Sequence, residues 1–276
     1  MEKLEFKVNE KTDLGKELRK HLPLFSNYQI EKLFKNKDVK VNGVRKTKSC
    51  VITPNDNIEV YYQVVNDEPW FSIIFQDDNI LIVNKRAGIE VISEDDRNLL
   101  DILKMDYNEL YAVHRIDRNT EGLVVFAKNI TAETELLKAF KERTIIKKYA
   151  LKVKGKVQIE AIKHKLYLKK LADASKVIVS EVKTSGYEEI VTRFNLIKYE
   201  DSNTILEAEL VTGKTHQIRA HISYFGHPII GDGKYGVGDN QQMCLTAYYI
   251  QFKFGKKSAL EYLNDKSFEI LPTWWK

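Results

Sequence analysis

Hydrophobic and polar residues follow different patterns in the first and the later parts of the chain. Residues 13–22 and 26–36 repeat apolar positions at helical spacing, each behind a polar residue suited to a helix cap, Asp13 and Ser26. From residue 39 to 62, apolar and polar residues alternate around an Asn42-Gly43 turn, as in paired strands. We therefore expect an N-terminal domain over residues 1–62, made of a helix pair and a small sheet.

A polar stretch with a proline, QVVNDEP, then breaks the alternation, so we place a linker at residues 63–72 and a second domain at residues 73–276. In this domain two strands surround a turn at 77–79, and residues 190–211 read as a hairpin. These patterns predict an α+β fold, in which a mainly antiparallel mixed sheet is flanked by helices.

Further elements of the second domain follow from shorter patterns. Residues 123–127 are a continuous apolar run and predict a buried strand, whereas residues 149–153 alternate and predict a strand with one buried face. Residues 154–187 are expected to form irregular strands and loops. Helices are predicted over residues 99–110, over residues 131–143 behind Thr131, and after Thr215 up to Gly226.

Charge changes this picture for the first domain. Its 62 residues hold 13 Lys and Arg against 9 Asp and Glu, so this quarter of the chain carries +4 of the total net charge of +5. An excess of positive charge favours a partner that bears phosphates.

Cysteine, histidine and hydropathy patterns exclude several classes. The two cysteines, Cys50 and Cys244, are too few for a disulfide framework and lack the spacing of metal ligands. His216 and His221 would lie about 140° apart around a helix, so no metal site is expected. No apolar run is long enough to span a membrane and the N-terminus lacks a secretory signal, so we expect a cytoplasmic protein.

The candidate chemistry lies in the stretch VHRIDRNTEGLVVFAK, residues 113–128. Asp117 is flanked by Arg115 and Arg118 in a loop before the buried strand, and nearby positive charge keeps a carboxylate ionised. An ionised aspartate can serve as a nucleophile. Taken alone, however, the same pattern fits an ordinary solvated ion pair.

Three motifs resemble those of the RluA-type pseudouridine synthases. The first is HRIDRNTEGLVVFAK, in which Glu121 replaces the usual Ser; the second is the KKYALKV strand. The third is GKTHQIRAH followed by GHPIIGDGKYG. The later string CLTAYYIQF also resembles a family strand, with Thr246 in place of His. Residues 39–62 resemble the second half of an S4 RNA-binding domain, V-x-V-N-G.

The resemblance implies that the chain isomerises uridine to pseudouridine without a cofactor. It assigns Asp117 to the sugar, as nucleophile or as base in a glycal route, Arg219 to pairing with Asp117, and Tyr149 to stacking on the detached uracil. By pattern alone, Tyr149 would be a core residue and Arg219 a surface ion pair. The resemblance also implies that His114 and Arg115 support the loop or contact the backbone of the RNA, and that Lys85 and Lys214 are candidates for phosphate contact. The S4-like domain is expected to contact RNA through Lys32, Lys35, Arg45, Lys46 and Lys48, although a solvated helix and hairpin would show the same charges.

The expected partner is RNA, with large-subunit ribosomal RNA favoured over transfer RNA, and the chain is expected to act as a monomer away from membranes. Two other classes compete with this interpretation. A catalytically silent RNA-binding or ribosome-assembly protein would not require Asp117, Tyr149 and Arg219 together. A glycosidase or hydrolase would require a second carboxylate as general acid, which the motifs do not offer.

Overall fold

The chain divides into two compact units, Met1–Pro69 and Trp70–Lys276. The computed structural model describes residues 2–22, 25, 27–62, 69–93, 98–171, 176–236 and 241–275. The expected cap Ser26 and most of the expected linker, residues 63–68, lie outside this range. The last two residues of that linker, Phe71 and Ser72, belong to the first strand of the second unit.

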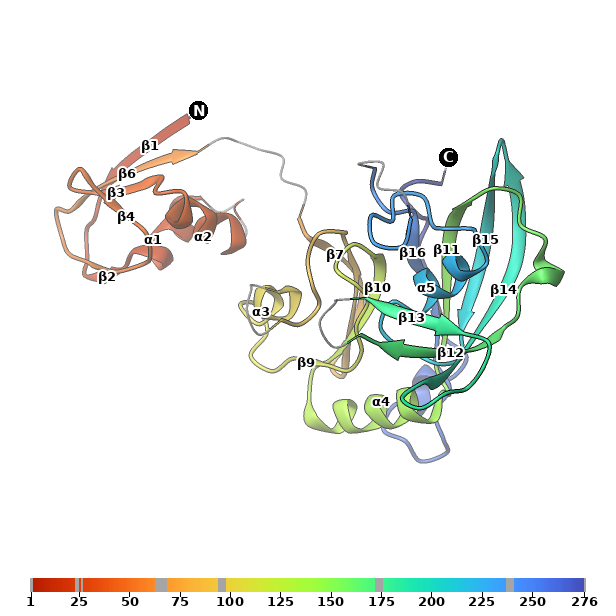
Figure 1. Cartoon of the computed structure of the whole chain (residues 1–276). Helices are drawn as coiled ribbons and strands as arrows, with labels where there is room; N and C mark the ends of the chain where they lie inside the picture. The colour runs from red at the N-terminus through yellow and green to blue at the C-terminus, as the bar shows by residue number, and fades with distance from the viewer. Residues whose placement is uncertain are drawn as a thin grey trace. The chain divides into compact units, whose positions relative to one another are not determined.

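The first unit combines two helices with a small sheet (Figure 1). Its strands form a four-stranded antiparallel sheet in the order β1-β6-β3-β4 and a separate pair, β2 with β5. Its elements are β1 (Glu2–Lys7), β2 (Thr12–Asp13), α1 (Leu14–His21), α2 (Asn27–Lys35), β3 (Val39–Val41), β4 (Val44–Lys46), β5 (Val51–Ile52) and β6 (Asn57–Tyr62).

Local sequence explains these elements. Asp13 caps α1 as expected, because its side chain accepts a hydrogen bond from the backbone N–H of Lys16. Asn42 and Gly43 both have positive φ, 51° and 80°, which is the backbone of a tight hairpin turn between β3 and β4. Strand β1 was not expected from the sequence. It adds an edge to the sheet by pairing with β6.

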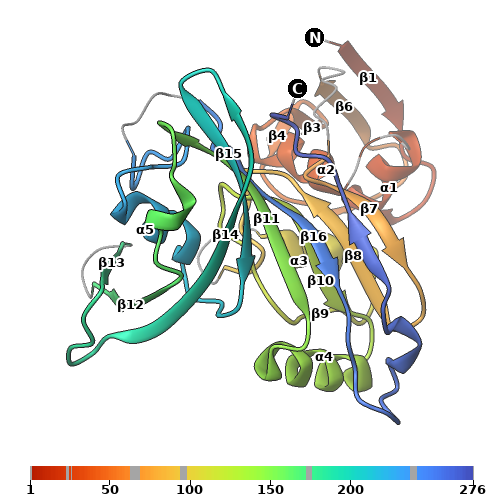
Figure 2. The same ribbon diagram turned by 90° about the vertical axis from the view of Figure 1, so that its right-hand side faces the viewer.

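The second unit is built on one large sheet that curves through the whole unit (Figure 2). Along its main path the strands run β13-β12-β14-β15-β11-β16-β10-β8-β7, while β9 pairs with β10 and β17 with β16. Their bounds are β7 (Phe71–Gln76), β8 (Ile80–Lys85), β9 (Tyr111–Ala112), β10 (Glu121–Ala127), β11 (Ile146–Lys154), β12 (Lys165–Lys170), β13 (Val177–Ser180), β14 (Glu188–Glu200), β15 (Asn203–Leu210), β16 (Leu245–Gln251) and β17 (Ser267–Glu269).

Pairing within this sheet is mainly antiparallel, which confirms the predicted fold class. Among the described pairings, β10 with β16 is the parallel one, and it joins Glu121 and Gly122 to Thr246 and Ala247. Gly122 has φ +125°, and a Cβ there would lie 2.3 Å from the carbonyl oxygen of Ala247. Glycine is therefore required where the chain after Asp117 enters β10.

The buried run at residues 123–127 is confirmed, since every residue of β10 is buried. The expectation of one buried face on β11 is wrong, because Ala150 is fully buried between its buried neighbours Tyr149 and Leu151. Strand β11 lies in the interior of the sheet, between β15 and β16, and both of its faces are covered there. A central strand of this kind gives its side chains little freedom.

Helices flank the sheet: α3 (Leu99–Leu103), α4 (Ile130–Glu142), α5 (Gln217–Tyr224), and the short 3₁₀ helices η1 (Ile159–Ala161) and η2 (Glu261–Leu263). The predicted caps Thr131 and Thr215 are wrong. Asn129 caps α4 by accepting from the N–H of Ala132, and His216, with φ 55°, precedes α5 without a side-chain cap. The predicted helix at 99–110 ends at Leu103, where the backbone turns. Within the described residues, the helices lack the combination of length and apolarity that a membrane span needs.

Candidate active site

The loop that carries Asp117 joins β9 to β10, and a buried lysine holds it by hydrogen bonds to backbone carbonyl groups. Lys85 donates hydrogen bonds from Nζ to the carbonyl oxygens of Arg86 and Ile89, each at 2.8 Å, and of Arg118 at 3.1 Å. Burial lowers the pKa of Lys85 to about 7, against the opposing effect of the Asp117 charge. The side chain is fully buried. The prediction that Lys85 contacts RNA phosphate is therefore wrong, because the sequence shows its charge but not its burial.

His114 also supports this loop from inside. Its Nε2 accepts a hydrogen bond of 2.9 Å from the backbone N–H of Val125, and its ring lies 4.6 Å from that of Phe140. Burial lowers the pKa of His114 to about 3, so the ring is neutral. Of its two expected roles, these contacts fit support of the loop, because a neutral ring already bonded to the backbone has no charge to offer a phosphate.

Arg219 joins two carboxylates that come from different loops. Its Nη1 lies 2.9 Å from Oδ2 of Asp117, while Nε and Nη2 donate to both carboxylate oxygens of Asp232 at 2.8 and 2.9 Å. The pair with Asp117, expected from the resemblance, is therefore present. The pairing with Asp232 was not expected from the sequence.

Asp232 holds the guanidinium rigidly. Its side chain is fully buried, and its Oδ1 also accepts the backbone N–H groups of Lys234 and Tyr235. Burial alone would raise the pKa of Asp232, but the hydrogen bonds and charge of Arg219 outweigh it and lower the pKa. Burial would lower the pKa of Arg219, but its hydrogen bonds to Asp232 and Asp117 and the charges of these two residues outweigh burial and raise the pKa. A buried bidentate pair of this kind fixes the third nitrogen, Nη1, in direction as well as position.

A second pair orients His216 toward Asp117. The hydroxyl of Tyr235 accepts the backbone N–H of Val177 at 2.8 Å and lies 2.9 Å from Nδ1 of His216. Nε2 of the same ring lies 3.8 Å from Oδ2 of Asp117. Burial lowers the pKa of His216, which favours the neutral form of the ring although the Asp117 charge opposes it.

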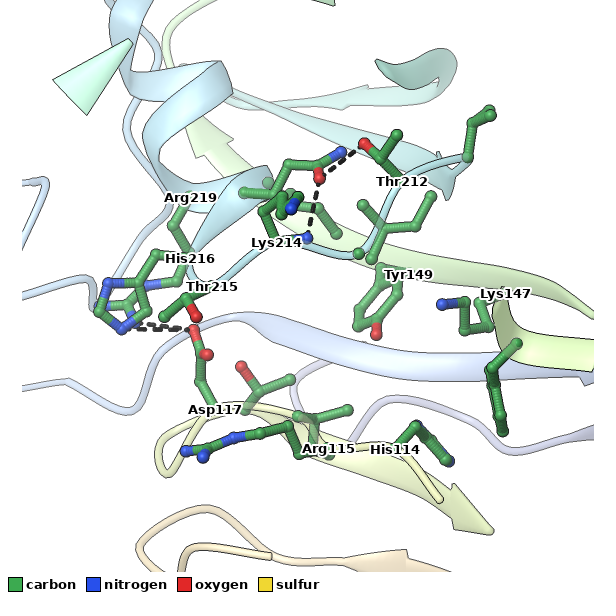
Figure 3. A pocket seen from close by; sticks show the side chains of 18 of the residues that line it. His114, Arg115, Asp117, Lys147, Tyr149, Thr212, Lys214, Thr215, His216 and Arg219 are labelled. Carbon is green, nitrogen blue, oxygen red and sulfur yellow. Dashed lines mark hydrogen bonds and ion pairs between the residues drawn. The ribbon is translucent and has the colours of Figure 1, made fainter. Parts of the chain in front are cut away.

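Asp117 and Tyr149 line one cavity of about 410 Å³ (Figure 3). Tyr149 is almost fully buried, and burial, with a smaller effect of the Asp117 charge, raises the pKa of its hydroxyl. Figure 3 shows this hydroxyl pointing into the cavity, and among the described residues it has no hydrogen-bond partner. An aromatic face and a carboxylate thus share a space of the size that small ligands occupy.

The cavity is strongly positive. Its described lining residues contribute one carboxylate, that of Asp117. They also contribute five cationic side chains, those of Arg115, Arg143, Lys147, Lys214 and Arg219. Arg115 and Lys214 line this cavity, and their contact with RNA stays a prediction. Arg115 also pairs loosely with Glu90, and Lys214 pairs directly with Glu188. Lys147 was not singled out from the sequence, because in a strand pattern it reads as an ordinary polar position.

A second hollow, of about 640 Å³, opens on the other side of Asp117. It shares Asp117, Arg115, His216 and Arg219 with the first, and it adds the basic residues Arg118, Lys170, Lys176 and Lys234. Lys170 and Lys176 come from residues 154–187, the region expected to form irregular strands and loops. Asp117 therefore lies where the first cavity meets this basic groove.

Two departures from the family pattern contact each other. Oε1 of Glu121 accepts from Oγ1 of Thr246 at 2.7 Å, and Thr273 donates to the same carboxylate. Thr246 in turn accepts from the indole N–H of Trp274 at 2.9 Å. The buried Glu121 is the first residue of β10, and it thus attaches the C-terminal segment to this strand.

The basic residues expected on the first unit lie at or near its surface. Lys32, Lys35, Arg45 and Lys48 are exposed and Lys46 is half-buried, while Nη1 of Arg45 donates to the carbonyl of Lys37. Their predicted contact with RNA stays a prediction. In the described parts of the chain, no cluster of three or more His, Cys, Asp or Glu side chains could hold a metal ion.

Comparisons with known proteins agree with this geometry. A family model described as RNA pseudouridylate synthase matches residues 79–224. An uncharacterized RNA pseudouridine synthase of Mycoplasma capricolum is 33% identical over 273 residues, which cover 89% of each chain. A ribosomal large subunit pseudouridine synthase C of Rickettsia felis is 28% identical, covering 93% of this chain and 96% of the relative.

The fold is also that of a solved human structure, RNA Pseudouridylate Synthase Domain Containing 4. It matches with a TM-score of 0.59 at 21% identity, over 73% of this chain and 88% of that one. Together with the family match across residues 79–224, which contain Asp117, Tyr149 and Arg219, this leads to one conclusion: the chain belongs to the RluA-type family and is an RNA pseudouridine synthase.

Proposed function

We propose that this enzyme acts on uridines of large-subunit ribosomal RNA and that Asp117 is the group that reacts at the sugar. The observation that carries the assignment of Asp117 is its place in the cavity, as a carboxylate held by a guanidinium and only partly buried. Its side chain is 21% exposed, whereas that of Asp232 on the same guanidinium is fully buried. A reacting group must be reachable by substrate, and only one of the two is.

In this proposal the N1–C1′ bond of the uridine breaks and its electron pair leaves with the uracil. Asp117 either attacks C1′ or removes a sugar proton in the glycal route. The detached uracil turns and C5 bonds to C1′, which breaks the bond between Asp117 and C1′ or, in the glycal route, comes with return of the proton from Asp117 to the sugar. The C5 proton then departs and N1 regains a proton. A uridine paired in a helix must first be flipped out of its stack to reach Asp117.

The other two side chains take roles that fit their surroundings. Arg219 pairs with Asp117 and orients it, which its bidentate attachment to Asp232 supports. Tyr149 stacks on the detached uracil, and its hydroxyl assists in removal of the C5 proton. The basic groove next to Asp117 suits the phosphates on either side of the target nucleotide.

Ribosomal RNA is favoured as substrate because the Rickettsia felis relative is named for the large ribosomal subunit and aligns with 93% of this chain. We also propose that the first unit is an S4-like RNA-binding domain. Its exposed basic side chains suit phosphate contacts, which would add affinity without reading sequence.

The substrate is tested with transcribed ribosomal and transfer RNA. Each RNA is incubated with the protein or with its Asp117→Asn variant, and pseudouridine is mapped. We expect modified positions in large-subunit RNA with the unchanged protein and none with the variant. Modification confined to transfer RNA would refute the proposed substrate. Comparing ribosomal RNA from cells with and without the protein identifies the natural sites.

The role of the first unit is tested by neutralising exposed cations. Lys35→Gln with Arg45→Gln should weaken RNA binding and lower the slope of log K against log salt by about 1 to 2. The matched control is Lys163→Gln, an exposed lysine of the second unit that pairs with Glu181. An unchanged slope in the double variant would show that this unit does not hold phosphates.

A further inference from the structure

Lys147 is a cation of the catalytic cavity that the roles proposed above leave unused. It lies on β11 two residues before Tyr149, so both side chains point to the same face of the strand. Both line the cavity that contains Asp117. In Figure 3 the ring of Tyr149 lies between Asp117 and the ammonium group of Lys147.

The surroundings of this ammonium group are poor in negative charge. Its Nζ lies 5.3 Å from the centre of the Phe140 ring and 3.5 Å from the position that a Cβ on residue 213 would occupy. Burial lowers the pKa of Lys147, and no carboxylate opposes the shift. Among the described residues Lys147 has no ion pair and no hydrogen bond from Nζ.

A partly desolvated cation without a counter-ion is unfavourable in the free protein. Its energetic cost is offset if an anion enters the cavity during the reaction. The reaction itself produces one, because breaking the N1–C1′ bond with its electron pair leaves a uracil anion, whose charge is shared between N1 and the carbonyl oxygens. A fixed positive group placed where charge develops is an effective way to lower such a barrier.

We propose that the ammonium group of Lys147 donates a hydrogen bond to a carbonyl oxygen of the departing uracil and stabilises the anion while it turns. This inference rests on the proposed role of Asp117, which places the sugar at one end of the cavity. A base attached to that sugar extends past Tyr149 toward Lys147. No proton is transferred in this step, so the lysine remains charged throughout.

A phosphate of the RNA is the competing partner, and the geometry disfavours it. Phe140, Ile145 and Tyr149 line the cavity around Lys147, and they suit the flat faces of a base. Arg143 lines the same cavity but is exposed, at the end of α4 with φ 61°. It suits a phosphate at the rim, and so provides a matched control for removal of a cation.

The test measures single-turnover release of tritium from C5 of the target uridine, together with RNA binding at several salt concentrations. Lys147→Met keeps the length of the side chain and removes its charge. We expect it to lower the single-turnover rate by about 10²-fold with nearly unchanged RNA affinity. Lys147→Arg should recover at least part of this loss. Arg143→Met should instead weaken binding and lower the salt slope by about 1.

Two outcomes would overturn the inference. If Lys147→Met weakens binding, lowers the salt slope and retains the rate, the lysine holds a phosphate. If it changes neither, the lysine only fills space. Failure of the proposed function gives a different result, because Asp117→Asn would then keep its activity whatever Lys147 does.

A second measurement does not depend on tolerance of methionine at this position. RNA with 5-fluorouridine at the target carries a better leaving group, because fluorine stabilises the uracil anion. Cleavage of its N1–C1′ bond, followed by mass spectrometry of the digested RNA, should be less sensitive to Lys147→Gln than cleavage of the uridine bond. Equal sensitivity of the two substrates would contradict contact with the leaving group.

Discussion

The loops around Asp117 and Asp232 present the same chemical group to the same arginine, yet their environments differ. Asp232 is fully buried, contacts Arg219 through both oxygens and accepts two backbone N–H groups. Asp117 is partly exposed, accepts one hydrogen bond from Arg219 and faces an open cavity. A carboxylate whose lone pairs are all used stabilises structure, whereas one with unused lone pairs remains available for reaction.

The largest combined effect is expected from Arg219→Ala. It removes the partner of both carboxylates and leaves Asp232 buried without a counter-ion, which costs about 3–5 kcal/mol of stability. It should also lower the single-turnover rate by about 10³-fold, more than it weakens RNA binding. Arg219→Lys should keep the positive charge but cannot bind Asp117 and Asp232 at the same time with the geometry of a guanidinium group. The control is Arg193→Ala, because Arg193 pairs with Glu209 in an exposed position and should contribute under about 1 kcal/mol.

Asp232→Asn separates structure from chemistry. It should reduce the free energy of unfolding by about 3 kcal/mol at neutral pH, because a buried charged partner is lost. The pKa of Asp232 is lowered in the folded protein, so its contribution is present above the ordinary aspartate pKa and is lost as pH falls through the folded value. The free energies of unfolding of the two proteins, measured in urea, should therefore begin to converge as pH falls below about 4. A constant difference at all pH values would contradict an ionised Asp232.

Tyr149→Phe tests the cavity next to Asp117. The ring remains for stacking but the hydroxyl is lost, and we expect C5 tritium release to slow by about 10²-fold. Tyr149→Leu removes both and should be slower still. If phenylalanine proves fully active, the tyrosine acts through its ring alone.

The smallest effect is expected at a third carboxylate, Glu121. Glu121→Gln weakens the hydrogen bonds from Thr246 and Thr273, which should cost about 1–2 kcal/mol and change the rate little. Thr246→Val should have a similar effect, and the double variant should cost less than the sum, since the two residues share one bond. Loss of activity in Glu121→Gln at unchanged stability would give this carboxylate a chemical role that the structure does not support.

Sequence alone predicted which residues belong to the site better than it predicted which of them contact one another. Asp117, Tyr149 and Arg219 stand in motifs, and the apolar run at residues 123–127 specified a buried strand. The pairing of Arg219 with Asp117 joins residues 102 positions apart, and only the motif resemblance anticipated it. Asp232, His216 and Lys147 were missed as site residues because their importance arises from burial and from partners on other strands and loops.

Lys85 shows the opposite error. Its charge suggested a phosphate contact, but the β8–β10 pairing buries it beneath the catalytic loop, where its donors are used by backbone carbonyls. Residue type and spacing predict which groups are present, whereas exposure depends on how the strands pair.

The central claim, that Asp117 and not Asp232 reacts with the substrate, is tested most directly by single-turnover tritium release from C5 of uridine in the target RNA. Asp117→Asn should fold with wild-type stability within about 1 kcal/mol, bind RNA and lose at least about 10⁴-fold in rate. Asp232→Asn, measured beside it, should be less stable but keep measurable turnover. Activity retained in Asp117→Asn together with complete loss in Asp232→Asn would contradict the account.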